Sequence, residues 1–398
     1  MRKLRLAVLL ALAAAGAVLA SAASAAPGVV GHLYVNDNTG GVNTIAGFDR
    51  HADGTLTPIA GSPFAAGGVG TGKGIASQGA LQLSGDGRYL LAVDAGSNEI
   101  SVLRIKPDGS LKPVGGGPVS SNGASPVSIA AHDQLVYVAN AGTATSSGET
   151  NYTGFTLNPG GHLRPLAGST VTLPDGSQPG DVLFNADGSK LVGTRVASSL
   201  IDSFTVSGDG VLTAAPGSPF AAQGLGPFGS EFRPTNPTQL YVSNAHNGAS
   251  AGTVSAFSDG ADGSLTTIGA SPFADNQTAP CWVEISHDGQ YLFTVNTASK
   301  TISSYSITTG GSLTLLPSSA PFVAPAVSPE DARLSPEGDT LWVVDPGADA
   351  ISGFNVTGGT LTELSSAAAV WCSTIRPLRT SKRPEHAMHT PVSAPLLP

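Results

Sequence analysis

The stretch Ala80–Val114 reads ALQLSGDGRYLLAVDAGSNEISVLRIKPDGSLKPV and determines the fold class. Four short runs of branched and aromatic residues alternate with turn signals, of which Asp86-Gly87 and Asp108-Gly109 are the clearest. Asp-Gly between apolar runs favours a hairpin, because both residues tolerate the positive φ of a tight turn. The stretch therefore predicts four antiparallel strands joined by hairpins, which is one blade of a β-propeller.

The same unit recurs along the chain. A Gly-x-Leu signal opens the fourth run every 48 to 55 residues, at Gly54, Gly109, Gly161, Gly210, Gly263, Gly311 and Gly359. This period is typical of propellers, and no 3.6-residue periodicity is sustained. We expect an all-β, seven-bladed β-propeller with four antiparallel strands per blade; a solenoid is the alternative, although its repeats seldom hold four hairpin-linked strands. Because a blade cannot bury its faces alone, residues 26–370 should form a single domain.

The N-terminus has the features of a secretory signal. Three cationic residues within the first five precede Leu6–Ala20, an apolar stretch of 15 residues that is too short to span a bilayer comfortably. The A-x-A site Ala23–Ala25 follows and predicts cleavage after its last residue. Residues 1–25 are thus expected to be a signal peptide, and the mature protein is expected to be secreted or extracytoplasmic, without membrane insertion.

Charge and composition narrow the possible partners. The formal net charge is −9, and it becomes −12 when the three cations of the expected signal peptide are removed. Nucleic acid and anionic lipid surfaces repel an acidic chain, so we expect neither as a partner. The histidines are scattered one to a repeat without the spacing of metal ligands, and no metal or other cofactor is expected. A monomer that binds a small polar ligand, a glycan or a protein fits this composition.

The chain begins in the middle of a repeat. Its first run, His32–Asn36, corresponds to the second strand of the other repeats. If the ring closes by strand exchange, Ala367–Arg376 should supply the missing strand, with Val370–Ile375 as its β-rich part. Residues 371–398 then form an atypical basic tail with several prolines. Two explanations stay open for this tail: it is disordered, or the reading frame shifts near its start.

The two cysteines, Cys281 and Cys372, could form a disulfide in an oxidising compartment. Cys281 is expected in the innermost strand of the sixth blade and Cys372 beyond the last blade. Because the sixth blade does not adjoin the closure, two unpaired thiols are the favoured expectation.

The repeats carry a family resemblance. Their pattern Ser-x-Asp-Gly-x-x-Leu-Tyr-Val, followed by Ile-Ser-x-Phe and Gly-x-Leu, is matched at Ser84–Tyr89, Ser286–Leu292, Ser335–Leu341, Ile100–Leu103 and Ile351–Phe354. This pattern resembles the lactonase-type propellers, which include 6-phosphogluconolactonases and carboxymuconate cyclising enzymes. The resemblance covers roughly Gly31–Ser366 and implies a seven-bladed propeller.

The motifs that carry lactone chemistry in this family differ here. They are Pro-His in the third blade, Gly-Pro-Arg-His and Asn-Glu-Leu in the fourth, and Ser-Asn-Arg-Gly in the fifth. The equivalent positions read Pro126-Val127, Gln178–Asp181, Thr194–Val196 and Ser243–His246. The reaction needs a group that handles the proton and guanidinium groups that hold the substrate and the developing oxyanion. The four differences therefore argue against the family's reaction.

Two sets of polar residues are candidates for a site. By the same resemblance, the turns after the second strands lie at one mouth of the channel, and they suggest a ligand-binding ring of Asp37, Asp94, Asn140, Arg195, Asn244, His246, Asn296 and Asp345. Turn capping explains the Asn positions more simply, whereas Arg195 and His246 are not turn-formers. The expected inner strands add Asp181, Glu231, Trp282, Glu284, Glu330, Asp331 and Arg333. An ion pair of Arg333 with Glu284 or Asp331 is expected to be structural.

Three functions stay open. A propeller that binds a ligand or partner is favoured, because the scaffold is intact while the family's catalytic motifs are missing. The alternative is a 6-phosphogluconolactonase-like lactone hydrolase, a carboxylic ester hydrolase with a rearranged channel-mouth site that uses Arg195, His246, Asp181 and Glu231. Export argues against 6-phosphogluconolactone itself as its substrate, since that compound is cytosolic. An interaction scaffold that uses the outer faces is the third possibility.

Overall fold

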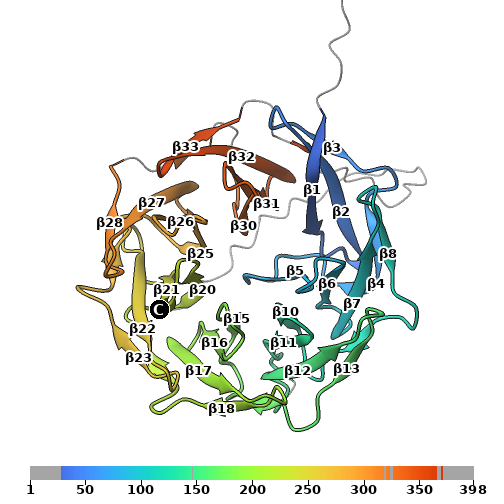
Figure 1. Ribbon diagram of the computed structural model, residues 1–398, viewed down its shortest axis with the longest axis horizontal. Coiled ribbons are helices and arrows are strands. Elements are labelled where there is room, and N and C mark those ends of the chain that lie inside the picture. The colour runs from blue at the N-terminus through green and yellow to red at the C-terminus, as the bar shows by residue number, and fades with distance from the viewer. Residues whose placement is uncertain (1–27, 146, 318–319, 323–325, 365–368, 371–398) are drawn as a thin grey trace, which may run out of the picture.

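The computed structural model describes residues 28–145, 147–317, 320–322, 326–364 and 369–370. These residues form seven antiparallel sheets set around a central axis like the blades of a propeller (Figure 1). The prediction of an all-β, seven-bladed propeller is therefore confirmed. The expected signal peptide, Cys372 and the basic tail lie outside the described residues.

Among the described residues, six of the blades have an innermost strand next to the axis. In blades two to seven the innermost strands are β5 (Leu81–Leu83), β10 (Pro126–His132), β15 (Pro179–Phe184), β20 (Pro227–Arg233), β25 (Pro280–Ile285) and β30 (Ala332–Leu334). The second strands of blades one to seven are β1 (Val29–Asn36), β6 (Tyr89–Asp94), β11 (Leu135–Asn140), β16 (Lys190–Arg195), β21 (Asn236–Asn244), β26 (Tyr291–Asn296) and β31 (Thr340–Asp345).

The outer strands repeat in all seven blades. The third strands are β2 (Gly41–His51), β7 (Glu99–Ile105), β12 (Asn151–Leu157), β17 (Leu200–Val206), β22 (Thr253–Asp259), β27 (Thr301–Ile307) and β32 (Ala350–Thr357). The fourth strands are β3 (Leu56–Pro58), β8 (Leu111–Pro113), β13 (Leu163–Pro165), β18 (Leu212–Ala214), β23 (Leu265–Thr267), β28 (Leu313–Leu315) and β33 (Thr360–Glu363).

Each blade has a further strand that the sequence analysis did not predict. After the fourth strand the chain turns back and pairs with the third strand of the same blade, as Phe220 does with Ile201. These strands are β4 (Phe64–Gly70), β9 (Val119–Ser120), β14 (Val171–Thr172), β19 (Phe220–Ala221), β24 (Phe273–Ala274), β29 (Ala320–Pro321) and β34 (Ala369–Val370). Among the described residues, blades two to seven thus hold five strands each, and blade one holds four.

The Gly-x-Leu signal marks the tight turn before each fourth strand. Its glycine has a φ between +75° and +89° in all seven repeats, a conformation that other residues adopt only with strain. Three of these glycines also accept a hydrogen bond from a tyrosine of the preceding blade: Tyr34–Gly109 at 2.7 Å, Tyr137–Gly210 at 2.8 Å and Tyr241–Gly311 at 2.9 Å. The signal therefore sets a turn within a blade and a link between blades.

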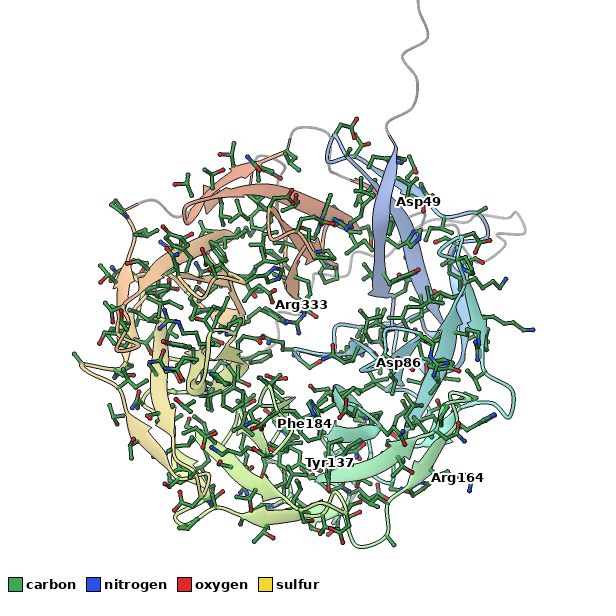
Figure 2. All side chains as sticks on the ribbon, viewed as in Figure 1. Asp49, Asp86, Tyr137, Arg164, Phe184 and Arg333 are labelled. Atoms are coloured by element: carbon green, nitrogen blue, oxygen red, sulfur yellow. The ribbon has the colours of Figure 1, made fainter. Side chains whose placement is uncertain are left out.

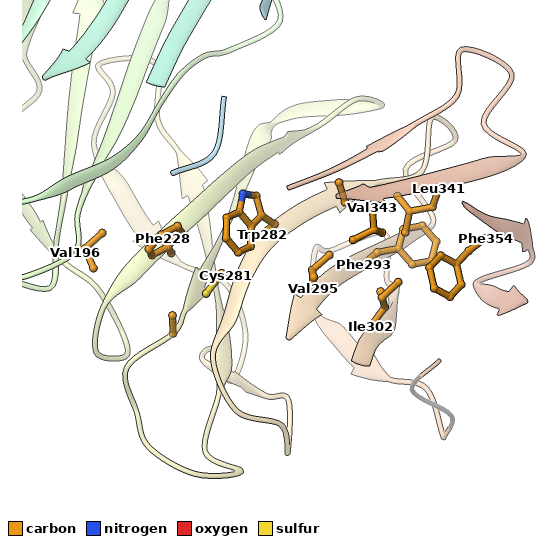
Figure 3. Close-up of a cluster of buried hydrophobic side chains, with 12 residues drawn as sticks. Val196, Phe228, Cys281, Trp282, Phe293, Val295, Ile302, Leu341, Val343 and Phe354 are labelled. Carbon is orange, nitrogen blue, oxygen red and sulfur yellow. The ribbon is translucent and has the colours of Figure 1, made fainter. Parts of the chain in front are cut away.

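The buried hydrophobic side chains gather between neighbouring blades. In the cluster of Figure 3, the rings of Phe228 and Trp282 lie 5.4 Å apart between their centroids, and Phe293 and Val343 continue the packing toward blade seven. Cys281 is a buried free thiol in β25, the innermost strand where it was expected. Since each blade covers its faces with the next one, the ring is stabilised as a whole.

The closure between blades seven and one differs from the expectation. Ala369–Val370 form β34, which pairs with β32 in blade seven, so the prediction that Val370 begins the missing strand of blade one is wrong. The pairing follows from the repeat, because β34 is the short fifth strand of its own blade. Side chains join the two blades instead: Val35 and Phe48 pack with Trp342, and Arg50 Nη1 lies 3.3 Å from Glu337 Oε2.

Candidate functional site: charged side chains at the channel

Charged side chains from three innermost strands meet at the channel. Arg333 of β30 points toward the centre of the ring (Figure 2). Its Nη1 atom lies 2.8 Å from Glu284 Oε2 and 3.5 Å from Glu231 Oε2. Glu284 also accepts the backbone amide of Leu334 through its other oxygen, at 3.0 Å. The expected ion pair between Arg333 and Glu284 is present, and Glu231 extends it to a third blade.

Arg333 keeps donors that a ligand can use. Its side chain is 40% exposed, whereas Glu231 and Glu284 are 22% and 11% exposed. Within the described part of the chain, every hydrogen bond of Arg333 comes from Nη1. The Nε and Nη2 groups are therefore available, on a guanidinium that two carboxylates hold in place.

Glu231 is the carboxyl group with the most altered titration at this centre. Burial, helped by the nearby negative charges of Glu284 and Asp181, raises its pKa to about 8 against the opposing effect of Arg333. Glu231 consequently holds a proton near neutral pH. A protonated carboxyl beside a guanidinium can donate or accept a proton.

Asp181 of β15 forms hydrogen bonds with the innermost strands on both sides, β10 and β20. Its Oδ2 atom accepts the backbone amide and the hydroxyl of Ser230, at 3.0 and 2.6 Å, and its Oδ1 atom accepts the hydroxyl of Ser128 at 3.2 Å. Burial still raises the pKa of Asp181 to about 6. Asp181 is buried and both of its carboxylate oxygens accept hydrogen bonds. We therefore expect it to hold Ser230, next to Glu231, in place and not to contact a ligand.

A segment ahead of β5 crosses the channel. The side-chain amide of Gln78 donates to the carbonyl of Ser230 at 2.9 Å and accepts the amide of Val283 at 3.1 Å. The indole of Trp282 donates to the carbonyl of Ser77 at 3.1 Å. These contacts join blade two to blades five and six across the ring, and the sequence analysis missed them. The long glycine-rich linker that ends at β5 was the available signal.

The predicted asparagines of the ring are held by their own blades. The side-chain amide of Asn140 donates to Asn151 at 2.9 Å, that of Asn244 to Ser255 at 2.8 Å, and that of Asn296 to Ser303 at 2.9 Å. All three are buried. They link the end of the second strand to the third strand, which agrees with a structural explanation for these positions.

Arg195 and His246 have different surroundings. Arg195 donates to both carboxylate oxygens of Asp202, from Nε at 2.6 Å and from Nη2 at 2.5 Å, and Tyr152 donates to the same carboxylate at 3.1 Å. His246 is exposed on the loop after β21 and lies beside Gly226. Among the described residues, no hydrogen bond or ion pair joins Arg195 to His246. Two donors of Arg195 are thus already engaged.

The predicted aspartates of the ring divide into two kinds. Asp94 accepts Ser101 at 2.6 Å and Asn43 at 2.9 Å, and Asp345 accepts the amides of Val327 and Ser328 at 2.7 and 2.9 Å. Asp37 is different: its Oδ2 atom accepts Thr44 at 2.6 Å, but its buried Oδ1 atom has no partner in the described part of the chain.

Asp37 borders a cavity of about 450 Å³ between blades seven, one and two. Glu330, Asp331 and Arg333 line the opposite side of this cavity, and Lys73 lies at its edge. Burial raises the pKa of Asp37 and of Glu330 to about 7. The cavity therefore adjoins the charged centre, because Arg333 belongs to both.

Two features are absent from the described residues. These residues contain no group of three or more His, Cys, Asp or Glu side chains arranged to hold a metal ion. They also contain no helix with the length and apolar character needed to cross a membrane.

The comparisons with known proteins agree with this fold. Residues 231–374 match the family described as lactonase, 7-bladed beta-propeller. Among curated proteins, none matches the sequence. A putative 6-phosphogluconolactonase from Bacteroides uniformis is a similar solved structure, with 21% identity, a TM-score of 0.69, and coverage of 85% of this chain and 95% of that chain.

Two other solved structures are similar to the same extent. A putative 6-phosphogluconolactonase from Bacteroides fragilis has 22% identity and a TM-score of 0.67, and the match covers 84% of this chain and 93% of that chain. The periplasmic gluconolactonase PpgL from Pseudomonas aeruginosa has 17% identity and a TM-score of 0.66, with 84% and 94% covered. The described part of the chain thus has a seven-bladed propeller fold, and residues 231–374 match the lactonase seven-bladed propeller family.

Proposed function

We propose that this protein is a lactonase-type propeller that binds a small, uncharged, hydroxyl-rich ligand of the sugar-lactone class at the channel. The observation that carries the proposal is the half-exposed guanidinium of Arg333, which Glu284 and Glu231 hold at 2.8 and 3.5 Å while its Nε and Nη2 groups are available. A guanidinium suits a ligand carbonyl oxygen, and the flanking carboxyl groups suit ligand hydroxyls.

The charge of the centre supports an uncharged ligand. Among the described residues, Asp181, Glu231, Glu284 and Asp331 lie around the guanidinium of Arg333. The negative charge of a phosphorylated ligand would be repelled by these carboxyl groups, even with Glu231 protonated. We therefore expect an unphosphorylated lactone to bind more tightly than its 6-phospho derivative.

Calorimetric titration with glucono-δ-lactam, a stable analogue of the lactone, tests the binding. We expect saturable binding by the mature protein and a loss of about tenfold or more in affinity in Arg333→Gln, because a hydrogen bond to a charged group is removed. Arg88→Gln is the matched control, since Arg88 is paired with Asp86 on the surface, 2.6 Å away. An absence of saturable binding, or equal affinity in both variants, would contradict the proposal.

Hydrolysis of the bound lactone is a second candidate function, favoured by one specific observation. Glu231 has a pKa raised to about 8 by burial and lies 3.5 Å from Arg333 Nη1. In this arrangement the guanidinium stabilises the developing oxyanion while the Glu231 carboxylate takes a proton from the attacking water. Perturbed carboxyl groups also occur in structural ion-pair networks, so binding without turnover is the primary proposal.

The pH dependence of turnover separates the two functions. If Glu231 is the general base, kcat/KM for glucono-δ-lactone above the spontaneous rate should rise with pH through about 8, and Glu231→Gln should abolish that rise. Hydrolysis that is no faster than the spontaneous rate, in a protein that still binds the lactam, would exclude catalysis and leave the binding proposal standing.

We also propose that the mature chain, from residue 26, acts outside the cytoplasm as a monomer. The support is the charged, apolar and A-x-A succession of residues 1–25. Fractionation of cells that express the full chain, with mass spectrometry of the N-terminus, should find the protein cleaved after Ala25 and exported. A cytoplasmic protein with an intact N-terminus would refute this.

A further inference from the structure

Exposed positive charge is concentrated on one blade. Seven lysine and arginine side chains of the described residues are exposed, and four of them belong to blade two: Arg88, Arg104, Lys106 and Lys112. The protein as a whole is acidic, with a formal net charge of −9, so this surface is a local exception. At physiological salt, charges are screened over about 8 Å, and a ligand at this surface is therefore governed by these four cations.

Strand alternation places three of these cations on one face of blade two. The apolar residues between them, Leu103 and Leu111, pack into the cluster between blades one and two. Arg104, Lys106 and Lys112 therefore lie on the opposite face, which is turned toward blade three. Arg104 and Lys112 are direct cross-strand partners in β7 and β8. Like charges opposite each other destabilise a sheet, and an anion bound between them removes that cost.

The carboxylates of blade two that lie near this face in the sequence are engaged elsewhere. Asp86 is paired with Arg88 at 2.6 Å, and Asp108 accepts the amide and the hydroxyl of Ser110 at 3.0 and 2.7 Å. None of the ion pairs among the described residues includes the other three cations. Their positive charge is therefore open to an anion from outside the protein.

The guanidinium of Arg104 is held in place by a buried aromatic ring. It lies 5.0 Å from the centroid of the Tyr89 ring, and its Nη2 atom donates to the Tyr89 hydroxyl at 2.6 Å. Tyr89 is 1% exposed, and its hydroxyl donates to the carbonyl of Pro159 in blade three at 3.0 Å. Within the described residues this is the one hydrogen bond of Arg104. Enough N–H donors remain for a bidentate contact with a carboxylate.

A polar groove adjoins these cations. It has a volume of about 420 Å³ and is lined by Tyr89 on blade two and by Asp133, Gln134 and Asn158 on blade three. Among the described residues, the side-chain amide of Gln134 and the Nδ2 group of Asn158 make no hydrogen bond. Amide and carboxylate groups of this kind suit the hydroxyls of a sugar. The surface thus places groups for hydroxyls next to a group for a carboxylate, the guanidinium of Arg104.

We propose that this face of blade two binds an acidic polysaccharide, with a uronate carboxylate on Arg104 and Lys112 and the neighbouring hydroxyls in the groove. Tyr89 is buried beneath its guanidiniums, so its ring is not available for base stacking, which favours a glycan over a single-stranded nucleic acid. The site is distinct from the channel, where Glu231 and Glu284 disfavour an anion. The inference therefore adds a second class of ligand and does not rest on lactone binding.

Calorimetric titration of the mature protein with trigalacturonate tests the site. We expect saturable binding that weakens between about 50 and 200 mM salt and that maltotriose, a neutral trisaccharide, does not reproduce. Lys112→Gln should lower the affinity about tenfold, because a contact with a charged group is lost. Arg164→Gln is the matched control, since Arg164 has the same place in β13 as Lys112 in β8 but lies opposite Thr156.

Lys112→Glu separates binding from folding. It places a carboxylate opposite Arg104, so we expect an unchanged or higher Tm together with the loss of trigalacturonate binding. The proposal is overturned by an absence of saturable binding, by equal affinities in Lys112→Gln and Arg164→Gln, or by equally tight binding of inorganic phosphate, which would indicate a site for any anion. Tighter binding of a single-stranded oligonucleotide would identify nucleic acid as the ligand instead. Each of these outcomes leaves the lactam titration at Arg333 unaffected.

Discussion

At the scale of single residues, the structure separates groups that hold the fold from groups that are available to a ligand. Arg195 and Arg333 both have carboxylate partners, yet their surroundings differ. Arg195 is 11% exposed and is bound at two atoms by Asp202, whereas Arg333 is 40% exposed and bonds through one nitrogen. The residue type alone therefore does not show whether an arginine can bind a ligand. What matters is how many of its N–H donors have no partner within the protein.

The pair of Arg195 and Asp202 gives a residue-scale prediction. Arg195→Leu should lower the free energy of unfolding by about 3 kcal/mol, because it leaves the nearly buried carboxylate of Asp202 unpaired. Urea titration measures the change. The double variant Arg195→Leu with Asp202→Leu should recover most of the loss, and neither variant should alter affinity for the lactam. A loss of lactam affinity in a folded Arg195→Leu protein would place Arg195 in the ligand site after all.

At the scale of the element, the Gly-x-Leu turn holds together both a blade and its neighbour. Gly210 has a φ of +84°, and an added Cβ atom would come 2.8 Å from Leu135 Cδ1. We expect Gly210→Ala to destabilise the protein by about 1–3 kcal/mol, from the left-handed backbone and from overpacking. Gly208→Ala is the control two residues away, where nothing lies within 4 Å. Equal unfolding midpoints for the two variants would show that this turn does not constrain the blade.

The sequence predicted the elements well where they follow the repeat. Each Gly-x-Leu lies at a positive-φ turn, because the signal is local and identical in every blade. The site was only partly predictable: Glu231, Glu284 and Arg333 each stand four residues after a proline, which is a register signal for their meeting at the channel. The contacts of Ser77 and Gln78 were not predicted: the glycine-rich linker signals a departure from the repeat pattern, but the partners of this segment belong to blades far away in the sequence.

At the scale of the whole molecule, stability depends on closing a ring. Blades seven and one meet through the packing of Trp342 with Val35 and Phe48 and through the ion pair of Arg50 with Glu337, without an innermost strand in blade one among the described residues. In a ring, the weakest interface between blades limits the stability of the whole. When it opens, the blades on both sides lose the neighbour that covers one of their faces. The closure between blades seven and one is therefore where the molecule should open first.

The buried carboxyl groups spread over the ring predict how its stability depends on pH. Burial raises the pKa of Asp181 and Asp275 to about 6, of Asp37 to about 7 and of Glu231 to about 8. Between their ordinary values near 4 and these raised values, the folded protein holds protons that the unfolded chain has lost. Raising the pH through this window therefore lowers the free energy of unfolding, by about 1.4 kcal/mol per pH unit for each full proton of difference.

Thermal unfolding between pH 5 and pH 9 measures this effect. Tm should fall from pH 5 to about pH 8, and Asp275→Asn should reduce the fall between pH 5 and 6, because it removes one buried carboxyl group while the acceptor for Tyr305 is kept. Asp86→Asn is the control: a hydrogen bond from Ser84 lowers the pKa of this exposed group to about 2, so its contribution is lost only as the pH falls below about 4. A Tm that stays constant or rises between pH 5 and 8 would mean that these carboxyl groups are hydrated in solution, and that the ring is open to water at its centre.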